Sequence, residues 1–108
     1  MGNLLPVLQV KTETAVLRQK EKEEKERQAA SAELEARCHA SAENGFDFIE
    51  VKCPIELEET IIEIPTAIRF SRDNKLLVIK VKDAAVTLSW NTSMVNRMKN
   101  FWYTLINN

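Results

Sequence analysis

Residues 18–28 of the chain contain no apolar side chain, and they lie inside residues 12–43, which contain no Gly and no Pro. Ala, Glu, Lys, Arg and Gln lose little rotamer freedom on winding, so this stretch predicts one long helix. At 1.5 Å per residue the helix measures roughly 48 Å, against about 30 Å for a small domain. Because its middle has no face to bury, we expect it to project from the body or to bridge to a partner.

The second half of this predicted helix carries small side chains at helical spacing. One row is Ala29, Ala32, Ala36 and Ala40, and an adjoining row is Ala30, Leu34 and Cys38. Small residues allow another backbone to come close, so we expect tight packing here, on the chain's own sheet or on the same helix of a second copy. Gly45 is predicted to end the helix in a left-handed conformation, and Thr12 or Thr14 to cap its start.

Before this helix, residues 1–11 are predicted to form an extended apolar arm, because Pro6 disfavours the helical conformation of Leu5. The large apolar residues of the arm need cover from the sheet or from another subunit. We expect the arm and the helix to bind a partner. The candidate contact residues are Leu4, Leu5, Val7, Leu8, Val16, Leu17, Ala29, Ala32 and Ala36.

From Phe46 onward the apolar period changes from helical to two, which is typical of strands. Residues 45–108 are therefore predicted to form a single globular domain with an antiparallel sheet of four to five strands, in which Pro54 and Pro65 mark breaks. Ile64 and residues 68–70 are assigned to strands, and residues 83–84 to a reversal between strands.

A capped amphipathic helix is predicted to follow the sheet, with Asn91-Thr92-Ser93 at its start. Its apolar stripe consists of Met94, Val95, Met98, Phe101, Trp102, Leu105 and Ile106. We expect this stripe to cover one face of the sheet. A long charged helix, an antiparallel sheet and a packed C-terminal helix make an α+β fold, in which residues 12–44 form the long helix.

Few residues suggest chemistry. His39 is the only histidine, and neither a Gly-rich phosphate loop nor a metal-spaced cluster occurs in the sequence. The acidic group Glu56, Glu58, Glu59 and Glu63 is interpreted as a solvated sheet edge in preference to a metal site. Cys38 and Cys53 are expected to be reduced, buried and structural, with a bridge between them as the alternative. We therefore expect a non-enzymatic protein without a cofactor.

Charge is divided along the chain although the net charge is only −1. Residues 46–64 contain six acids against Lys52, a net −5, and residues 65–108 contain seven bases against two acids, a net +5. The bases favour single-stranded nucleic-acid binding as an alternative function. The residues that would carry it are Arg69, Arg72, Lys80, Lys82, Arg97 and Lys99. Pairing between strands or between subunits is the preferred interpretation, because the pI of about 5.9 is below neutrality.

The sequence thus predicts a binding or assembly protein, with a second copy of itself and a target protein as partners. Phage-encoded inhibitors and structural accessories are one class of such proteins, and a small-ligand pocket between two subunits is a further alternative. We expect a cytoplasmic protein without a membrane partner, because no basic-headed signal segment and no apolar run of spanning length is present.

Overall fold

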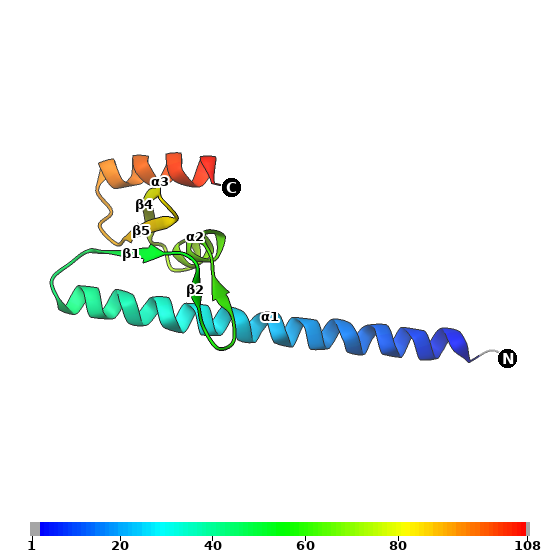
Figure 1. Cartoon of the computed structure of the whole chain (residues 1–108). Helices are drawn as coiled ribbons and strands as arrows, with labels where there is room; N and C mark the ends of the chain where they lie inside the picture. The colour runs from blue at the N-terminus through cyan, green and yellow to red at the C-terminus, as the bar shows by residue number, and fades with distance from the viewer. Residues whose placement is uncertain (1–2, 108) are drawn as a thin grey trace.

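The structure of the chain, a computed structural model, describes residues 3–107 (Figure 1). Its elements are α1 (Leu4–Glu43), β1 (Phe48–Lys52), β2 (Ile55–Glu56), β3 (Ile61–Ile62), α2 (Ile64–Asp73), β4 (Leu77–Lys82), β5 (Ala85–Ser89) and α3 (Met94–Ile106). The α+β class is confirmed. The molecule measures 67 × 27 × 23 Å, because α1 extends well beyond the body that the other elements form.

Helix α1 is 40 residues long and already begins at Leu4, so the prediction of an extended arm over residues 1–11 is wrong for residues 4–11; residues 1–2 lie outside the described range. Asn3 is the N-terminal cap, which places Pro6 in the first helical turn. The first-turn N–H groups have no acceptor within the helix, so proline loses nothing there. Thr14 does not cap the helix either, since its Oγ1 donates to the carbonyl of Val10 at 2.9 Å.

The other end of α1 is as expected. Helix α1 ends at Glu43 with Asn44 as its C-terminal cap, and Gly45 follows with φ of +85°. Glycine adopts this left-handed conformation without strain, which allows the chain to turn back toward β1. The C-terminal part of α1 then packs against β1 and α2, with Ala30 and Leu34 as its buried side chains.

The main sheet has three antiparallel strands in the order β1-β5-β4, and β2 and β3 form a separate two-stranded hairpin. The predicted single sheet of four to five strands is therefore divided into two. In the main sheet, Val51 of β1 is paired with Val86 of β5, which is paired with Val81 of β4. The two residues predicted to reverse the chain, Asp83 and Ala84, join β4 to β5 with positive φ at both positions, as a two-residue hairpin with a type I′ turn requires.

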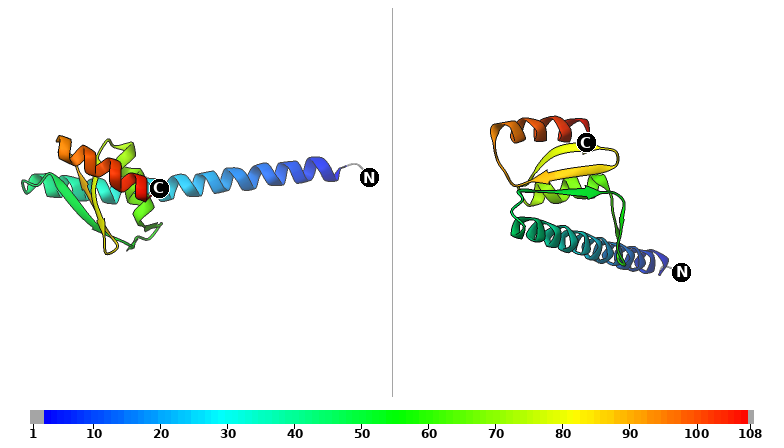
Figure 2. Two further views of the ribbon diagram at one scale, coloured as in Figure 1. Left: turned by 90° about the horizontal axis from the view of Figure 1, so that it is seen from above. Right: turned by 60° about the vertical axis from the view of Figure 1, so that its left-hand side comes forward.

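One face of the main sheet forms the core, and on the other side α3 packs along β4 (Figure 2). The core face presents side chains that are at most 6% exposed, namely Ile49, Val51, Val78, Val86 and Leu88. Helix α2 packs against β4 and β5, and α1 packs against β1. The opposite face carries Glu50, Lys80 and Thr87 side by side across the three strands, so it is polar and open.

Helix α2 corrects two strand assignments, those of Ile64 and of residues 68–70. Pro65 occupies the first turn of α2, where proline favours a helix, and it does not mark a break in a sheet. Ala67, Ile68 and Ser71 then lie on one side of α2 and are buried. Counted from Ile64, these positions follow a helical i, i+3, i+4, i+7 pattern that the Ile-rich sequence concealed.

Helix α3 runs beside β4, the edge strand of the main sheet, and lies on the opposite side of the sheet from α1 (Figure 2). The Asn100 Oδ1 atom accepts the backbone N–H of Val78 at 2.8 Å. At the other edge strand, β1, the hydroxyl of Ser41 on α1 donates to the carbonyl of Phe48 at 2.6 Å. Each edge strand thus obtains a polar side chain from a neighbouring helix, which satisfies a backbone group that an open edge would leave unpaired.

The packing of α3 against the sheet is confirmed, but the side it presents is the opposite of the predicted one. No residue of α3 is buried, and Asn96, Asn100, Tyr103 and Thr104 are its half-buried residues. The predicted cap is present, since Ser93 Oγ accepts the backbone N–H of Asn96 at 3.3 Å. A sheet edge needs hydrogen-bonding side chains, so α3 directs its polar side toward β4 and its apolar stripe outward.

We predict that Leu34→Ala lowers the free energy of unfolding by about 2–5 kcal/mol, because Leu34 is 0% exposed where α1 meets the body. Urea unfolding followed by circular dichroism measures this change. Glu35→Ala is the matched control on the exposed side of the same helical turn, and it should change stability by no more than about 0.5 kcal/mol. Equal stability of the two variants would show that this row does not anchor α1.

Candidate interaction surfaces

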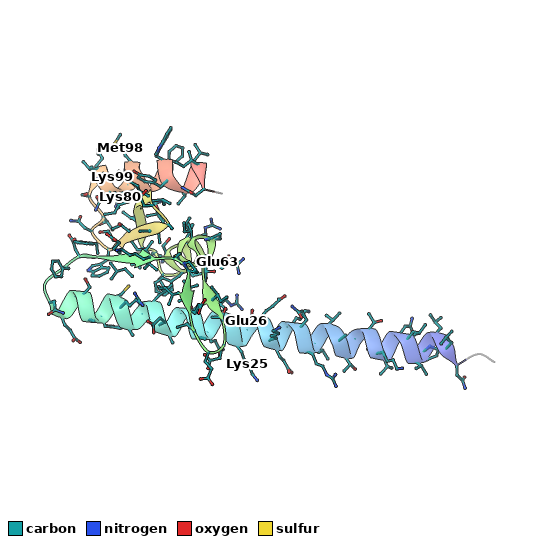
Figure 3. All side chains as sticks on the ribbon, viewed as in Figure 1. Lys25, Glu26, Glu63, Lys80, Met98 and Lys99 are labelled. Atoms are coloured by element: carbon teal, nitrogen blue, oxygen red, sulfur yellow. The ribbon has the colours of Figure 1, made fainter. Side chains whose placement is uncertain are left out.

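The N-terminal part of α1 extends beyond the body. Every residue from Leu4 to Lys25 is exposed, and Glu26 is the first that is half-buried. Lys25 and Glu26 mark the position where the hairpin and α2 lie beside α1 (Figure 3). We call residues 4–25 the projecting segment. At 1.5 Å per residue it measures roughly 33 Å.

The projecting segment carries six of the predicted partner-binding residues. They are 47–70% exposed and comprise Leu4, Leu5, Val7, Leu8, Val16 and Leu17. Residues 4–10, which we call the α1 tip, hold five large apolar side chains, since Val10 is also 62% exposed. Successive helical residues turn by about 100°, so these side chains cover an arc of about 220°, and Gln9 lies in the remaining sector. A helix that carries so wide an apolar surface is normally buried.

From Arg18 to Gln28, α1 carries only charged and amide side chains, and several of them interact along the surface of the helix. Arg27 pairs with Glu24, and Gln19 donates to Glu23 at 3.2 Å. The hydrogen bond from Arg27, followed by its positive charge, lowers the pKa of the Glu24 carboxyl. These contacts bring solvated groups together and leave no apolar seam, so this part of α1 does not form a dry helix–helix contact.

The alanine rows of α1 separate in the structure. Ala30 and Leu34 are buried against the chain's own body, with Cys38 packed beside them. Ala32 and Ala36 are exposed and Ala29 is half-buried. The row that contains Ala30 and Leu34 therefore packs against the body of the chain. Most of the other row stays at the surface, including the predicted contact residues Ala32 and Ala36.

A second apolar surface lies on α3, and the sequence did not predict its exposure. The outward residues are 56–79% exposed, and we call them the α3 stripe: Met94, Val95, Met98, Phe101, Trp102, Leu105 and Ile106. Met98 points away from β4 and from the rest of the body (Figure 3). The signal that reveals this orientation is the polar opposite side of α3, where Asn100 can bond a sheet edge.

The six candidate nucleic-acid-binding residues do not form one groove. Arg69 of α2 lines an open hollow of about 410 Å³ together with Glu23 and Glu26 of α1. Lys80 and Lys82 lie on the open face of the sheet, where Glu50, Lys52 and Asp83 line the same hollow. Arg97 and Lys99 lie on α3, and Arg72 near the end of α2. Acidic side chains thus accompany the bases on α2 and on the sheet.

A hollow beside Cys38 brings together side chains that could take part in catalysis. It has a volume of about 300 Å³, and Glu35, Cys38 and His39 line it along with Trp90. Burial, followed by the negative charge of Glu35, raises the pKa of the Cys38 thiol. A reactive cysteine needs a lowered pKa because the thiolate is the nucleophile, so this environment has the wrong sign for nucleophilic catalysis.

The thiol of Cys53 also has a raised pKa. Burial, followed by the Glu63 charge, raises the pKa of its thiol, while Arg37 acts in the opposite direction. Both cysteines are free, as predicted, but they are half-buried and not fully buried. Within residues 3–107 no group of three or more His, Cys, Asp or Glu side chains is arranged to hold a metal ion. None of the helices in this range combines the length and the hydrophobicity that a membrane span requires.

We predict that Cys38 is alkylated slowly near neutral pH, more slowly than in the urea-unfolded chain. Because its pKa is raised above the usual 9.0, the fraction of thiolate stays small until the solution is alkaline. Iodoacetamide modification followed by mass spectrometry in the Cys53→Ser variant measures the rate. The rate should climb through the alkaline range, whereas a plateau below neutral pH would indicate an activated thiolate.

Comparison of the chain with protein-family models, with curated proteins and with solved structures found no match to any of them. The geometry of the two apolar surfaces is therefore the basis for assigning a function.

Proposed function

We propose that this chain is a non-enzymatic assembly protein that binds a neighbouring copy or a target protein through the projecting segment of α1. The observation that carries the proposal is that the α1 tip is apolar over more than half of its circumference and lies outside the body. Full burial of a large apolar side chain stabilises by about 1.5–3 kcal/mol, so covering this tip provides a substantial driving force for association.

The position of the tip identifies the kind of contact. The α1 helix is anchored at Ala30 and Leu34, roughly 40 Å from Leu4, so the tip does not reach the body of its own chain. Because Leu5, Val7 and Val10 point in different directions around the axis, a single flat surface would cover only part of the tip. A bundle of tips from several copies, or a socket on a target protein, covers all sides.

The chemistry elsewhere on the molecule supports a binding role. The cysteine thiols have raised pKa values, and the bases on α2 and on the sheet share their hollows with acids. An assembly role uses the segment that the fold leaves free, whereas a nucleic-acid role would need the six bases to act from separate surfaces. We therefore prefer assembly to single-stranded nucleic-acid binding.

We predict that Leu5→Gln with Leu8→Gln abolishes self-association, because the change makes the α1 tip polar without loss of helix propensity. Sedimentation velocity over a range of concentrations should show an oligomer for the native chain and a monomer for the variant. Lys20→Gln with Lys22→Gln is the matched control within the charged part of α1, and it should sediment like the native chain.

A target protein in place of a second copy gives a different result in the same experiment. The native chain then sediments as a monomer, and immobilised native chain retains a partner from a host lysate that the Leu5→Gln, Leu8→Gln chain does not retain. Native and variant chains that match in both sedimentation and retention would contradict the proposal.

A further inference from the structure

The α3 stripe is the largest apolar surface that the proposed function leaves unused. Its seven side chains are each more than half exposed and form one continuous band along α3. At about 100° per residue they fall within an arc of about 140°. They expose on the order of several hundred Å², as large as the largest apolar patch of a typical monomer or larger, and such patches usually bind something.

The margins of the stripe are basic. Arg97 and Lys99 are the only charged residues between Met94 and Ile106, and at about 100° per residue they lie just beyond the two opposite edges of the stripe. Lys80 is a further base on β4, the strand against which α3 packs. An apolar band with cations along both sides and no acid is complementary to a surface that is apolar inside and anionic outside.

We propose that the α3 stripe binds the surface of an anionic lipid bilayer, with α3 lying in the plane of the interface. The apolar side chains would enter the boundary between headgroups and acyl chains, and Arg97 and Lys99 would extend to lipid phosphates. Helix α3 is 13 residues long, roughly 20 Å, which is shorter than the roughly 30 Å hydrocarbon core, so it lies on the membrane and does not span it.

The position of α3 permits this contact. Helix α3 is the outermost layer beyond β4, and α1 lies on the far side of the sheet (Figures 1 and 2). The bond from Val78 N–H to Asn100 holds the polar side of α3 toward the body. A flat surface can therefore approach the whole length of the stripe without contact with α1. The expectation of no membrane partner rested on the absence of a signal segment and of an apolar run of spanning length, and neither bears on a helix that lies in the interface.

Charge disfavours a second copy as the occupant of the stripe. If two α3 helices packed face to face, Arg97 and Lys99 of one copy would lie near the same cations of the other. The α1 tip of a second copy is apolar but contains no acid, and the next charges along α1 are Lys11 and Glu13, which cancel. Neither segment offers the negative charge that the basic margins favour, whereas anionic lipid does.

Vesicle flotation of the full chain tests the proposal. Native protein should float with vesicles that contain phosphatidylserine and much less with pure phosphatidylcholine vesicles, and added salt should weaken the binding. Met98→Gln with Trp102→Gln should abolish flotation, while Met98→Leu with Trp102→Phe should retain it. Arg97→Gln with Lys99→Gln should weaken binding to anionic vesicles by roughly fivefold for each charge removed.

Two controls separate this result from misfolding and from the assembly role. The substituted side chains are exposed, so circular dichroism and thermal unfolding should remain unchanged. The Leu5→Gln, Leu8→Gln chain should still float, since the α1 tip is remote from α3. The proposal is overturned if native protein does not float with anionic vesicles, or if the Met98→Gln, Trp102→Gln chain floats equally well. If native protein does not bind vesicles and the Met98→Gln, Trp102→Gln chain loses self-association, the α3 stripe is a contact between copies of the chain.

Discussion

The contact of Ala30 and Leu34 with the sheet determines the shape of the whole molecule. These are the buried residues of a helix that is 40 residues long, and both lie in its C-terminal half. The fold therefore holds α1 at its C-terminal end, and the N-terminal part of the same helix extends onward without further contact with the body. The charged and amide side chains from Arg18 to Gln28 make this arrangement stable in water, since they need no cover.

The sheet edges impose a second constraint, which decides the direction of α3. A β-strand at an edge has backbone groups that its sheet does not pair, and these require polar partners. Ser41 supplies one on β1 and Asn100 supplies one on β4. Because the side of α3 that contains Asn100 faces β4, the apolar side of the same helix faces outward. The exposed stripe is thus a consequence of satisfying hydrogen bonds at the edge.

The long helix, its uncovered middle and its end at Gly45 could be predicted from the sequence because local propensity determines them. Pro6 and Pro65 were misinterpreted for a common reason: proline breaks a helix in its interior but is tolerated in its first turn, and the sequence did not show where each helix begins. The α3 stripe illustrates a different limit. Periodicity identifies which residues share a face, but it does not say whether that face meets the sheet, because the need of Val78 for an acceptor arises only in the folded sheet.

The unbroken course of α1 has a consequence for how chains of this type tolerate change in length. Adding or removing one residue in the charged middle rotates everything before it by about 100° and moves it by about 1.5 Å along the axis. A tip with a single narrow apolar face would then point away from any surface that it had contacted. Because Leu4, Leu5, Val7, Leu8 and Val10 spread over about 220° of the helix circumference, a rotation of about 100° still leaves part of this apolar surface facing its original direction. A change in length of one residue therefore redirects the apolar surface of the tip only in part.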